Sequence, residues 1–481
     1  AGYHVLNLLL HILNAWLLFD ILRNTFRGVT ISRTDYEDKS SPLLLPLVAT
    51  LLFLCHPIQT HAVTYITSRF LLMASFFSLL SLASYIRFRS AETGYSRYFQ
   101  ALTVISAALG MMCKEFTFTL PFLIALYEFT FFRTDMRNRI RLLAPLALTL
   151  PIIPLLVFLQ NGGFTALDGT MRTITAADAS QISRFDYLLT QFSVIVIYLR
   201  LLFFPAGQNI DHDITVQHSL VSLPVLASFL LLLTFFIYAI YRLFRSLQNN
   251  ESNEARIIPF GIIWFFVALS VESSFIPMGE LQAEYRLYLA SIGIIIAVTA
   301  FCAAVSLRYA IGRKPFCIVA VIIVVTLCAT TMLRNRVWQS KISLWQDAVS
   351  KSPTKARPHY NLGTAYREHG DLTSAKKEWE TTLTINPAHA EAMIQMGTLA
   401  AIQGNLQQAE KLYLESLKAP PGATDPDKSM AHYNLGKIYE KWSQPQRALQ
   451  HYEKFINVVS PIYLDYKPDA EQRIARLHQA L

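Results

Sequence analysis

The sequence predicts an all-α protein in two parts, a polytopic membrane helical bundle followed by an α-solenoid. Three observations lead to this prediction. The 481 residues are 53% hydrophobic and only 16% charged, whereas soluble domains carry about 25% charged residues. Long apolar runs recur up to about residue 336, and a repeat begins near residue 356. We therefore expect a membrane domain in 1–336 and a repeat domain in 337–481.

Eleven apolar segments make up the predicted membrane part. A helix that crosses a bilayer takes roughly 20 mainly apolar residues. No water is available at that depth to satisfy loose backbone groups, so a helical bundle is expected. The predicted segments are 3–22, 42–55, 70–86, 98–113, 116–132, 142–159, 187–204, 219–241, 257–275, 287–307 and 315–333.

The distribution of Arg and Lys predicts which loops face the cytoplasm. Basic residues gather after the first, third, fifth, eighth and tenth segments, and the positive-inside rule makes these loops cytoplasmic. Segment 187–204 would invert the later order if it crossed fully, so we expect it to be re-entrant or interfacial. The repeat domain is then external, and the first segment must enter from outside, so we expect a further crossing upstream of Ala1. The external loops are 56–69, 114–115, 160–218 and 274–286.

The C-terminal part repeats itself. Leu362-Gly363 and Met396-Gly397 lie 34 residues apart, and Leu435-Gly436 follows after an insertion of five residues. An Ala recurs 12 residues after each Gly, and the period is that of the tetratricopeptide repeat, whose paired helices approach closely at small residues. Residues 341–353 and 467–481 are predicted to add one more helix and a polar capping helix. The concave face of such a solenoid binds a peptide or a partner domain; the alternative is a rigid spacer.

Lys114 and Glu115 interrupt an apolar run at a predicted external turn. A charge in the middle of a bilayer costs roughly 2.5–3.5 kcal/mol. A charged pair within an apolar run therefore indicates a structural or functional role. We interpret Lys114 as a phosphate-binding residue at the membrane surface and Glu115 as the group that orients the phosphate or the acceptor. The alternative is an ion pair that closes the hairpin.

Two further external segments concentrate polar side chains. The loop from His56 to Arg69 also carries Gln59 and His61, and we expect these four residues to line a substrate cavity. The two His side chains do not share a helix face and no carboxylate lies beside them, so the sequence predicts no metal site there.

Glu284-Tyr285-Arg286-Leu287-Tyr288 opens the tenth segment. Arg286 has a planar fork of donors that suits phosphate, and Glu284 and Tyr288 are expected beside it in the cavity. The alternative is that Arg286 and Tyr288 only anchor the helix at the interface.

These motifs, in this order, resemble a known family. The run Gly2-Tyr3-His4-Val5-Leu6-Asn7, the loop from His56 to Arg69, the Lys114-Glu115 turn and Glu284-Tyr285-Arg286-Leu287-Tyr288 are followed by tetratricopeptide repeats. The whole resembles the transmembrane and tetratricopeptide-repeat-containing protein O-mannosyltransferases and their bacterial relatives, which are GT-C membrane glycosyltransferases. The resemblance covers nearly the whole chain.

The resemblance implies a fold, a reaction and roles. The bundle would be GT-C-like, and the enzyme would move a sugar from a polyprenyl-phosphate carrier to a hydroxyl of a protein acceptor on the external side. Lys114 and Arg286 match positions suited to the lipid phosphate, and the repeats would hold the acceptor. The donor is then a polyprenyl-phosphate sugar; a divalent metal has no support in the sequence.

The chain departs from the family pattern at two positions and lacks one expected residue. His61 stands where the family commonly has Glu, and Ala290 stands where it commonly has Pro. GT-C enzymes usually carry their catalytic acid in the first external loop, which would lie upstream of Ala1. The catalytic base is therefore not identified, and Glu115 is the candidate within this chain.

Other function classes receive less support. A non-catalytic membrane-anchored repeat scaffold, or a subunit of a larger membrane complex, is the main alternative to the transferase; a transporter is a third. No GxxxxGK[ST], no GxGxxG after a strand and no GxSxG occurs, so nucleotide and serine-hydrolase chemistry lack their signatures. The charge of +9 is explained by orientation in the membrane, and no nucleic-acid partner is expected. We expect a bacterial inner membrane, with the repeats in the periplasm.

Overall fold

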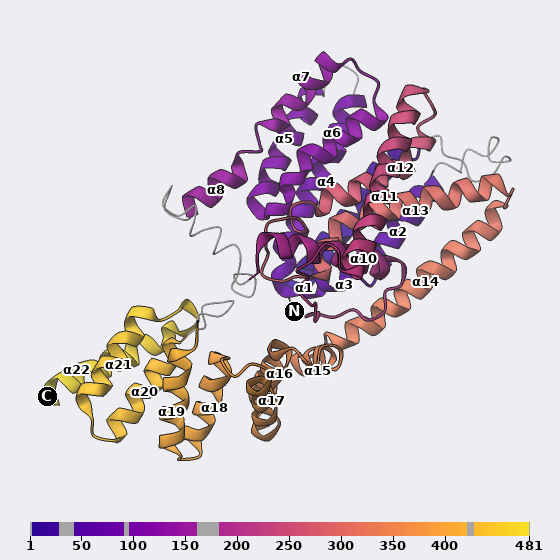
Figure 1. Cartoon of the computed structure of the whole chain (residues 1–481). Coiled ribbons are helices and arrows are strands. Elements are labelled where there is room, and N and C mark those ends of the chain that lie inside the picture. The colour runs from indigo at the N-terminus through magenta and orange to yellow at the C-terminus, as the bar shows by residue number, and fades with distance from the viewer. Residues whose placement is uncertain (1, 28–42, 91–95, 161–181, 421–427, 481) are drawn as a thin grey trace. The chain divides into compact units, whose positions relative to one another are not determined.

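The structure, a computed structural model, describes residues 2–27, 43–90, 96–160, 182–420 and 428–480 (Figure 1). Throughout these residues the regular structure is helical, and no strand occurs in them, so the all-α prediction is confirmed. The described chain divides into two compact units. The first unit consists of the described residues up to Trp338, except Asp211–Asp213. The second unit consists of Asp211–Asp213 and the chain from Gln339 onward.

Each predicted membrane segment contains a helix. Over the described residues, seven stretches are long and apolar enough to cross a membrane, and α2, α5, α6 and α12 are shorter, at 12 to 18 residues. The helices are α1 (Gly2–Thr25), α2 (Leu44–Cys55), α3 (Gln59–Thr64), α4 (Arg69–Ser90), α5 (Ser96–Cys113), α6 (Leu120–Phe131), α7 (Met136–Ala147), α8 (Ile152–Gln160), α10 (Arg184–Phe203), α11 (Leu223–Gln248), α12 (Glu254–Leu269), α13 (Leu287–Arg308) and α14 (Arg313–Val337), with short 3-10 turns η3 (Ile66–Ser68), η4 (Glu115–Thr119) and η7 (Glu284–Arg286).

The ninth segment ends earlier than the sequence predicted. The expected span 257–275 gives way to α12, which stops at Leu269. The hydroxyl of Ser270 donates to the carbonyl of Val267, and this local bond competes with continuation of the helix. Residues 270–283 therefore form an irregular loop that carries polar side chains between α12 and α13.

The hairpin of α12 and α13 is closed by two glycines. A Cβ added to Gly261 would lie 2.3 Å from the carbonyl oxygen of Gly293, and a Cβ added to Gly293 would lie 2.3 Å from the carbonyl oxygen of Gly261. Small residues let membrane helices approach closely where no hydrophobic effect drives them together. This crossing fixes the two helices that flank the loop 270–283.

Polar contacts in the first unit separate into two ends. At one end Asn7 donates to the carbonyls of Val63 and Tyr65. At the other end the described ion pairs join Arg87 to Asp20 and Arg89 to Glu128. The first set lies beside a loop predicted external and the second beside loops predicted cytoplasmic; which side of the membrane each end faces stays a prediction.

Helix α10 contacts one end of the bundle along its length. Its 20 residues are enough to cross a membrane, but its first turn binds the loop after α12, and its middle and last turns bind residues of predicted external loops. A crossing helix would meet loops of both ends, so these contacts favour the interfacial alternative. The hydrogen bonds are Tyr187 to the carbonyl of Glu272, Gln191 to that of Leu281, Tyr198 to that of Ala283, and His56 to that of Leu202.

The second unit is a stack of helix pairs, which Figure 1 shows in order from brown to yellow. The recurring Ala375, Ala409 and Ala448 are fully buried, as the repeat pattern predicted. The pattern did not single out the aromatic that fills each pair: Tyr413, for example, lies where a Cβ on Gly397 would come within 2.8 Å. The helices are α15 (Lys341–Lys351), α16 (Ala356–Glu368), α17 (Leu372–Ile385), α18 (Ala390–Ile402), α19 (Leu406–Lys418), α20 (Ser429–Lys441), α21 (Pro445–Val458), η8 (Pro461–Tyr466) and α22 (Lys467–Ala480).

Candidate functional site

Lys114 lies between α5 and η4 with an extended backbone, at φ −162° and ψ 145°. Its carbonyl accepts hydrogen bonds from the backbone and the hydroxyl of Thr117, and this turn directs the side chain across the end of the bundle. The ammonium pairs with Glu272 at 3.3 Å. The alternative expectation of an ion pair with neighbouring Glu115 is therefore not what the structure shows: the partner comes from the loop after α12.

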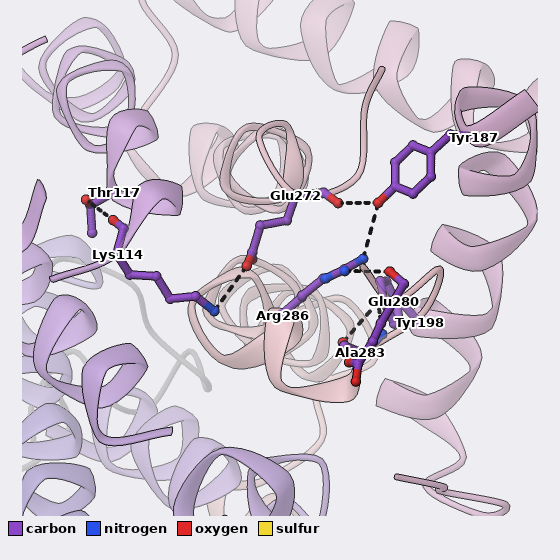
Figure 2. Close-up of polar contacts among 8 residues, drawn as sticks. All are labelled: Lys114, Thr117, Tyr187, Tyr198, Glu272, Glu280, Ala283 and Arg286. Carbon is purple, nitrogen blue, oxygen red and sulfur yellow. Dashed lines mark hydrogen bonds and ion pairs between the residues drawn. The ribbon is translucent and has the colours of Figure 1, made fainter. Parts of the chain in front are cut away.

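Glu272 connects the two predicted phosphate-binding residues (Figure 2). Its carboxylate reaches Lys114, and its backbone carbonyl accepts a hydrogen bond from the hydroxyl of Tyr187 at 3.1 Å. That same hydroxyl lies 3.5 Å from a terminal nitrogen of Arg286. The Glu272 side chain is only 3% exposed, so this connection is shielded from water.

Arg286 is buried, with 3% of its surface exposed. One terminal nitrogen donates to the carbonyl of Glu280 at 2.6 Å, and the other lies 3.5 Å from the carbonyl of Leu281 as well as from Tyr187. Its Nε–H meets no acceptor among the described residues. A guanidinium has five N–H donors, so part of its donor capacity is left for another acceptor.

Aromatic rings cover Lys114. Its Nζ lies 4.4 Å from the centroid of the Tyr285 ring, which is a cation–π distance. The ring of His61 meets Tyr285 edge-on at 5.2 Å, and on its other side it contacts Trp338 at 5.4 Å. Glu115 follows Lys114 directly in the chain. Half-buried Glu115 thus lies near Lys114 without being its ion-pair partner.

Three of the residues expected to line a cavity are held in internal hydrogen bonds. The Nδ1 atom of His56 accepts from the backbone of Ile58, so its Nε2–H is left to donate to Leu202. Gln59 donates to the hydroxyl of Ser291 at 3.1 Å. Glu284 accepts from the backbone of Asn209 at 2.7 Å. All three join segments far apart in the sequence, and their contact with a substrate stays a prediction.

Tyr288 and Arg69 lie apart from the Lys114 pair. The hydroxyl of Tyr288 is buried between His11 at 2.8 Å and Asn14 at 3.0 Å, both on α1. Arg69 packs over the exposed ring of Tyr3 at 4.8 Å. Neither residue contacts Lys114 or Arg286 in the described contacts, so the structure does not bring these four side chains together.

Sequence reasoning missed Glu272 and Tyr187. The apolar window assigned Glu272 to the interior of a span, although the run Ser270-Val271-Glu272-Ser273-Ser274 is polar enough to mark a loop. Tyr187 had no local signal, since an aromatic residue in an apolar segment is expected without any function. In the described part of the chain, no three His, Cys, Asp or Glu side chains cluster as metal ligands would.

The comparisons with known proteins cover both parts of the chain. The tetratricopeptide repeat family matches residues 388–458. The protein O-mannosyl-transferase F38B6.6 of Caenorhabditis elegans is 25% identical over 81% of this chain and 51% of its own length. TMTC4 of Mus musculus is 25% identical over 78% of this chain and 54% of its own length, and human TMTC3 is 23% identical over 87% and 46%.

The chain therefore spans about half the length of these curated relatives. Among solved structures, yeast Tom70 is 11% identical, with 86% of this chain and 92% of that chain covered, but its TM-score of 0.27 is too low for a structural argument. The resemblance that the motifs predicted is confirmed by the sequence comparisons. The homologues of this integral membrane protein include protein O-mannosyl-transferases of the TMTC family, similar over most of this chain.

Proposed function

We propose that the chain is a membrane glycosyltransferase that moves a sugar from a polyprenyl-phosphate carrier to a hydroxyl of a protein acceptor on the external side. The main support for this proposal is the position of Arg286. Its buried guanidinium has an N–H group without an acceptor among the described residues, and it lies beside the Lys114–Glu272 pair at the end of the bundle. The names of its relatives support the reaction class and make mannose the first sugar to test.

The chemistry needs a base for the acceptor and cations for the leaving group. As the acceptor oxygen attacks the anomeric carbon, the bond from that carbon to the phosphate oxygen breaks, and negative charge grows on the departing lipid phosphate. Arg286 offers planar donors to those oxygens, and Lys114 offers a point charge in a site poor in water. Glu115 is the candidate base within this chain.

The repeat unit would hold the acceptor protein. Its stacked helix pairs form the type of surface on which extended peptides bind, and the family match to residues 388–458 supports a role in protein binding. On the orientation argued from charge, this unit is external, and a periplasm is the compartment we propose. The matched curated relatives named above come from animals, and an endoplasmic reticulum lumen is the equivalent compartment there.

The test is a comparison of glycopeptides from exported proteins by mass spectrometry. Cells that lack this gene are complemented with the wild type, with Arg286→Ala or with Arg200→Ala. Arg200 is an exposed residue on α10 and serves as the matched control. We expect a hydroxyl-linked sugar to disappear without the gene, to return with the wild type and with Arg200→Ala, and to fall at least tenfold with Arg286→Ala.

Two results would count against the proposal. Full transfer by Arg286→Ala, at equal amounts of protein in the membrane, would remove the phosphate role of that residue. An unchanged glycan profile in cells without the gene, together with loss of a membrane complex, would favour the scaffold alternative.

A further inference from the structure

Helix α14 is attached to its unit mainly through its C-terminal half. Most of its length faces outward (Figure 1), and its buried residues are Leu327 and Arg334. The hydroxyl of Thr331 donates to the carbonyl of Cys55 at 2.7 Å. One turn later, Asn335 accepts from the hydroxyl of Thr64 at 2.9 Å. These bonds bring α14 against the end of α2 and against α3.

Two thiols lie at this attachment. Cys328 precedes Thr331 by three residues, so both occupy the same face of α14. Thr331 is the residue whose hydroxyl donates a hydrogen bond to the backbone carbonyl of Cys55. The Cys328 side chain also lies within interaction range of the Cys55 thiol. Both residues are half-buried and free, and both lie where α14 packs against α2.

The proposed orientation places this thiol pair at the external end of the bundle. Cys55 ends α2 directly before the loop that begins at His56, and Cys328 lies in the half of α14 that leads to Trp338. Periplasmic and lumenal compartments maintain disulfides, whereas the cytosol keeps thiols reduced. A pair of neighbouring thiols at this end therefore meets an oxidising environment.

We propose that Cys55 and Cys328 form a disulfide bond that fastens α14 to α2; the proposal rests on the external orientation given under the proposed function. The two thiols lose two protons and two electrons as the sulfur–sulfur bond forms. The oxidant is the disulfide of an external thiol–disulfide oxidoreductase, which becomes a dithiol by exchange through a mixed disulfide.

The bond would fix the external end of α14 where it meets the candidate site. Trp338 follows α14 and contacts His61, which contacts Tyr285, the ring that covers Lys114. A crosslink between residues far apart in the sequence also restricts the unfolded chain strongly. The disulfide would thus stabilise the attachment of α14 and the aromatic contacts beside Lys114.

A count of free thiols tests the proposal on the full chain. Membranes are denatured in SDS with a polyethylene-glycol maleimide, with or without prior reduction, and each free thiol adds one step in gel mobility. The chain has five cysteines. We expect three labels without reduction and five after it.

Three variants identify the pair. Cys55→Ser and Cys328→Ser should each give four labels in both conditions, because the remaining partner is then free. Cys302→Ser removes an exposed thiol of α13 and should keep a difference of two labels between the conditions. Five labels in the wild type without reduction would overturn the proposal, as would a difference of two labels that survives in Cys55→Ser.

The count is independent of catalysis. Arg286→Ala should show the same three and five labels whether or not it transfers sugar. Three labels without reduction in a chain that lacks transferase activity would support the disulfide and contradict the proposed function. Five labels without reduction in an active chain would contradict the disulfide and support the proposed function.

Discussion

Lys114 and Glu272 form an ion pair whose side chains are 18% and 3% exposed. Removing one partner of such a pair leaves the other charge buried without compensation, which costs roughly 3–5 kcal/mol, whereas replacing both by uncharged groups is often neutral. We expect Lys114→Met alone to lower the stability by about 3 kcal/mol and Lys114→Met with Glu272→Gln to recover most of it.

Thermal unfolding in detergent measures this difference, and sugar transfer by the same proteins separates stability from function. The double variant should fold like the wild type and still lack transfer, because the cation proposed for the phosphate is gone. If the double variant is as unstable as Lys114→Met, then the loss of stability does not come from an uncompensated charge on Glu272.

The facing imidazoles of His432 and His451 make the repeat unit sensitive to acid. Their Nδ1 atoms are 3.0 Å apart, so one must donate to the other. Burial lowers the pKa of each to about 4, and the charge of Lys454 adds to this in both cases. The unfolded chain, with a pKa near 6.5 for each, takes up protons first as the pH falls.

The sign of the effect follows from this difference. Stability from this pair is complete above about pH 6.5, declines as the pH falls towards about 4, and does not change on the alkaline side. Melting temperatures at pH 7.5 and 5.5 measure the decline. His432→Gln with His451→Gln cannot be protonated and should show a smaller fall; an equal fall in this variant would assign the acid sensitivity to other groups.

At the scale of elements, the crossing of α12 and α13 decides where the loop 270–283 lies. A methyl group at Gly293 would lie 2.3 Å from the carbonyl oxygen of Gly261, so the helices would have to separate. We expect Gly293→Ala to destabilise the bundle by about 1–3 kcal/mol and to lower transfer through the displaced loop. Gly110→Ala is the control, since its Cβ would make ordinary contacts at 3.5 Å or more.

Two measurements on both variants check this prediction. The first is the unfolding temperature of each variant, and the second is its transfer rate at 20 °C below that temperature. A Gly293→Ala protein with wild-type stability would mean that the two helices tolerate a wider separation.

The elements show which parts of the structure the sequence could predict. Apolar length and repeat spacing are local signals, and they predicted the helices and the repeat pairs. The end of α12 at Leu269 was missed because a hydropathy window averages over Glu272 and its polar neighbours. The partner of Lys114 was missed for a different reason: the pair joins positions far apart in the sequence, and they meet because α12 packs against η4 and α6.

At the scale of the whole molecule, α10 decides the orientation of everything that follows it. If α10 lies at the interface, the chain before and after it is on the same side. We expect Arg184→Cys and Ala206→Cys, two exposed positions at either end of α10, each made in a chain without other cysteines, to react with a membrane-impermeant maleimide added from outside.

Intact cells or sealed vesicles give this result directly, with lysed membranes as the control for reactivity. Labelling of only one of the two positions from outside would show that α10 crosses, and the external assignment of the repeat unit would then be inverted.

The aromatic contacts beside Lys114 have a mechanical consequence. Trp338 is the last residue before the chain that leads to the repeats, and its ring bears on His61, which bears on Tyr285 beneath the ammonium of Lys114. Close-packed side chains transmit strain, so a shift of the Trp338 ring disturbs the rings packed after it. We therefore expect a displacement of the chain after Trp338 to reach the ammonium of Lys114, the residue proposed to bind the lipid phosphate.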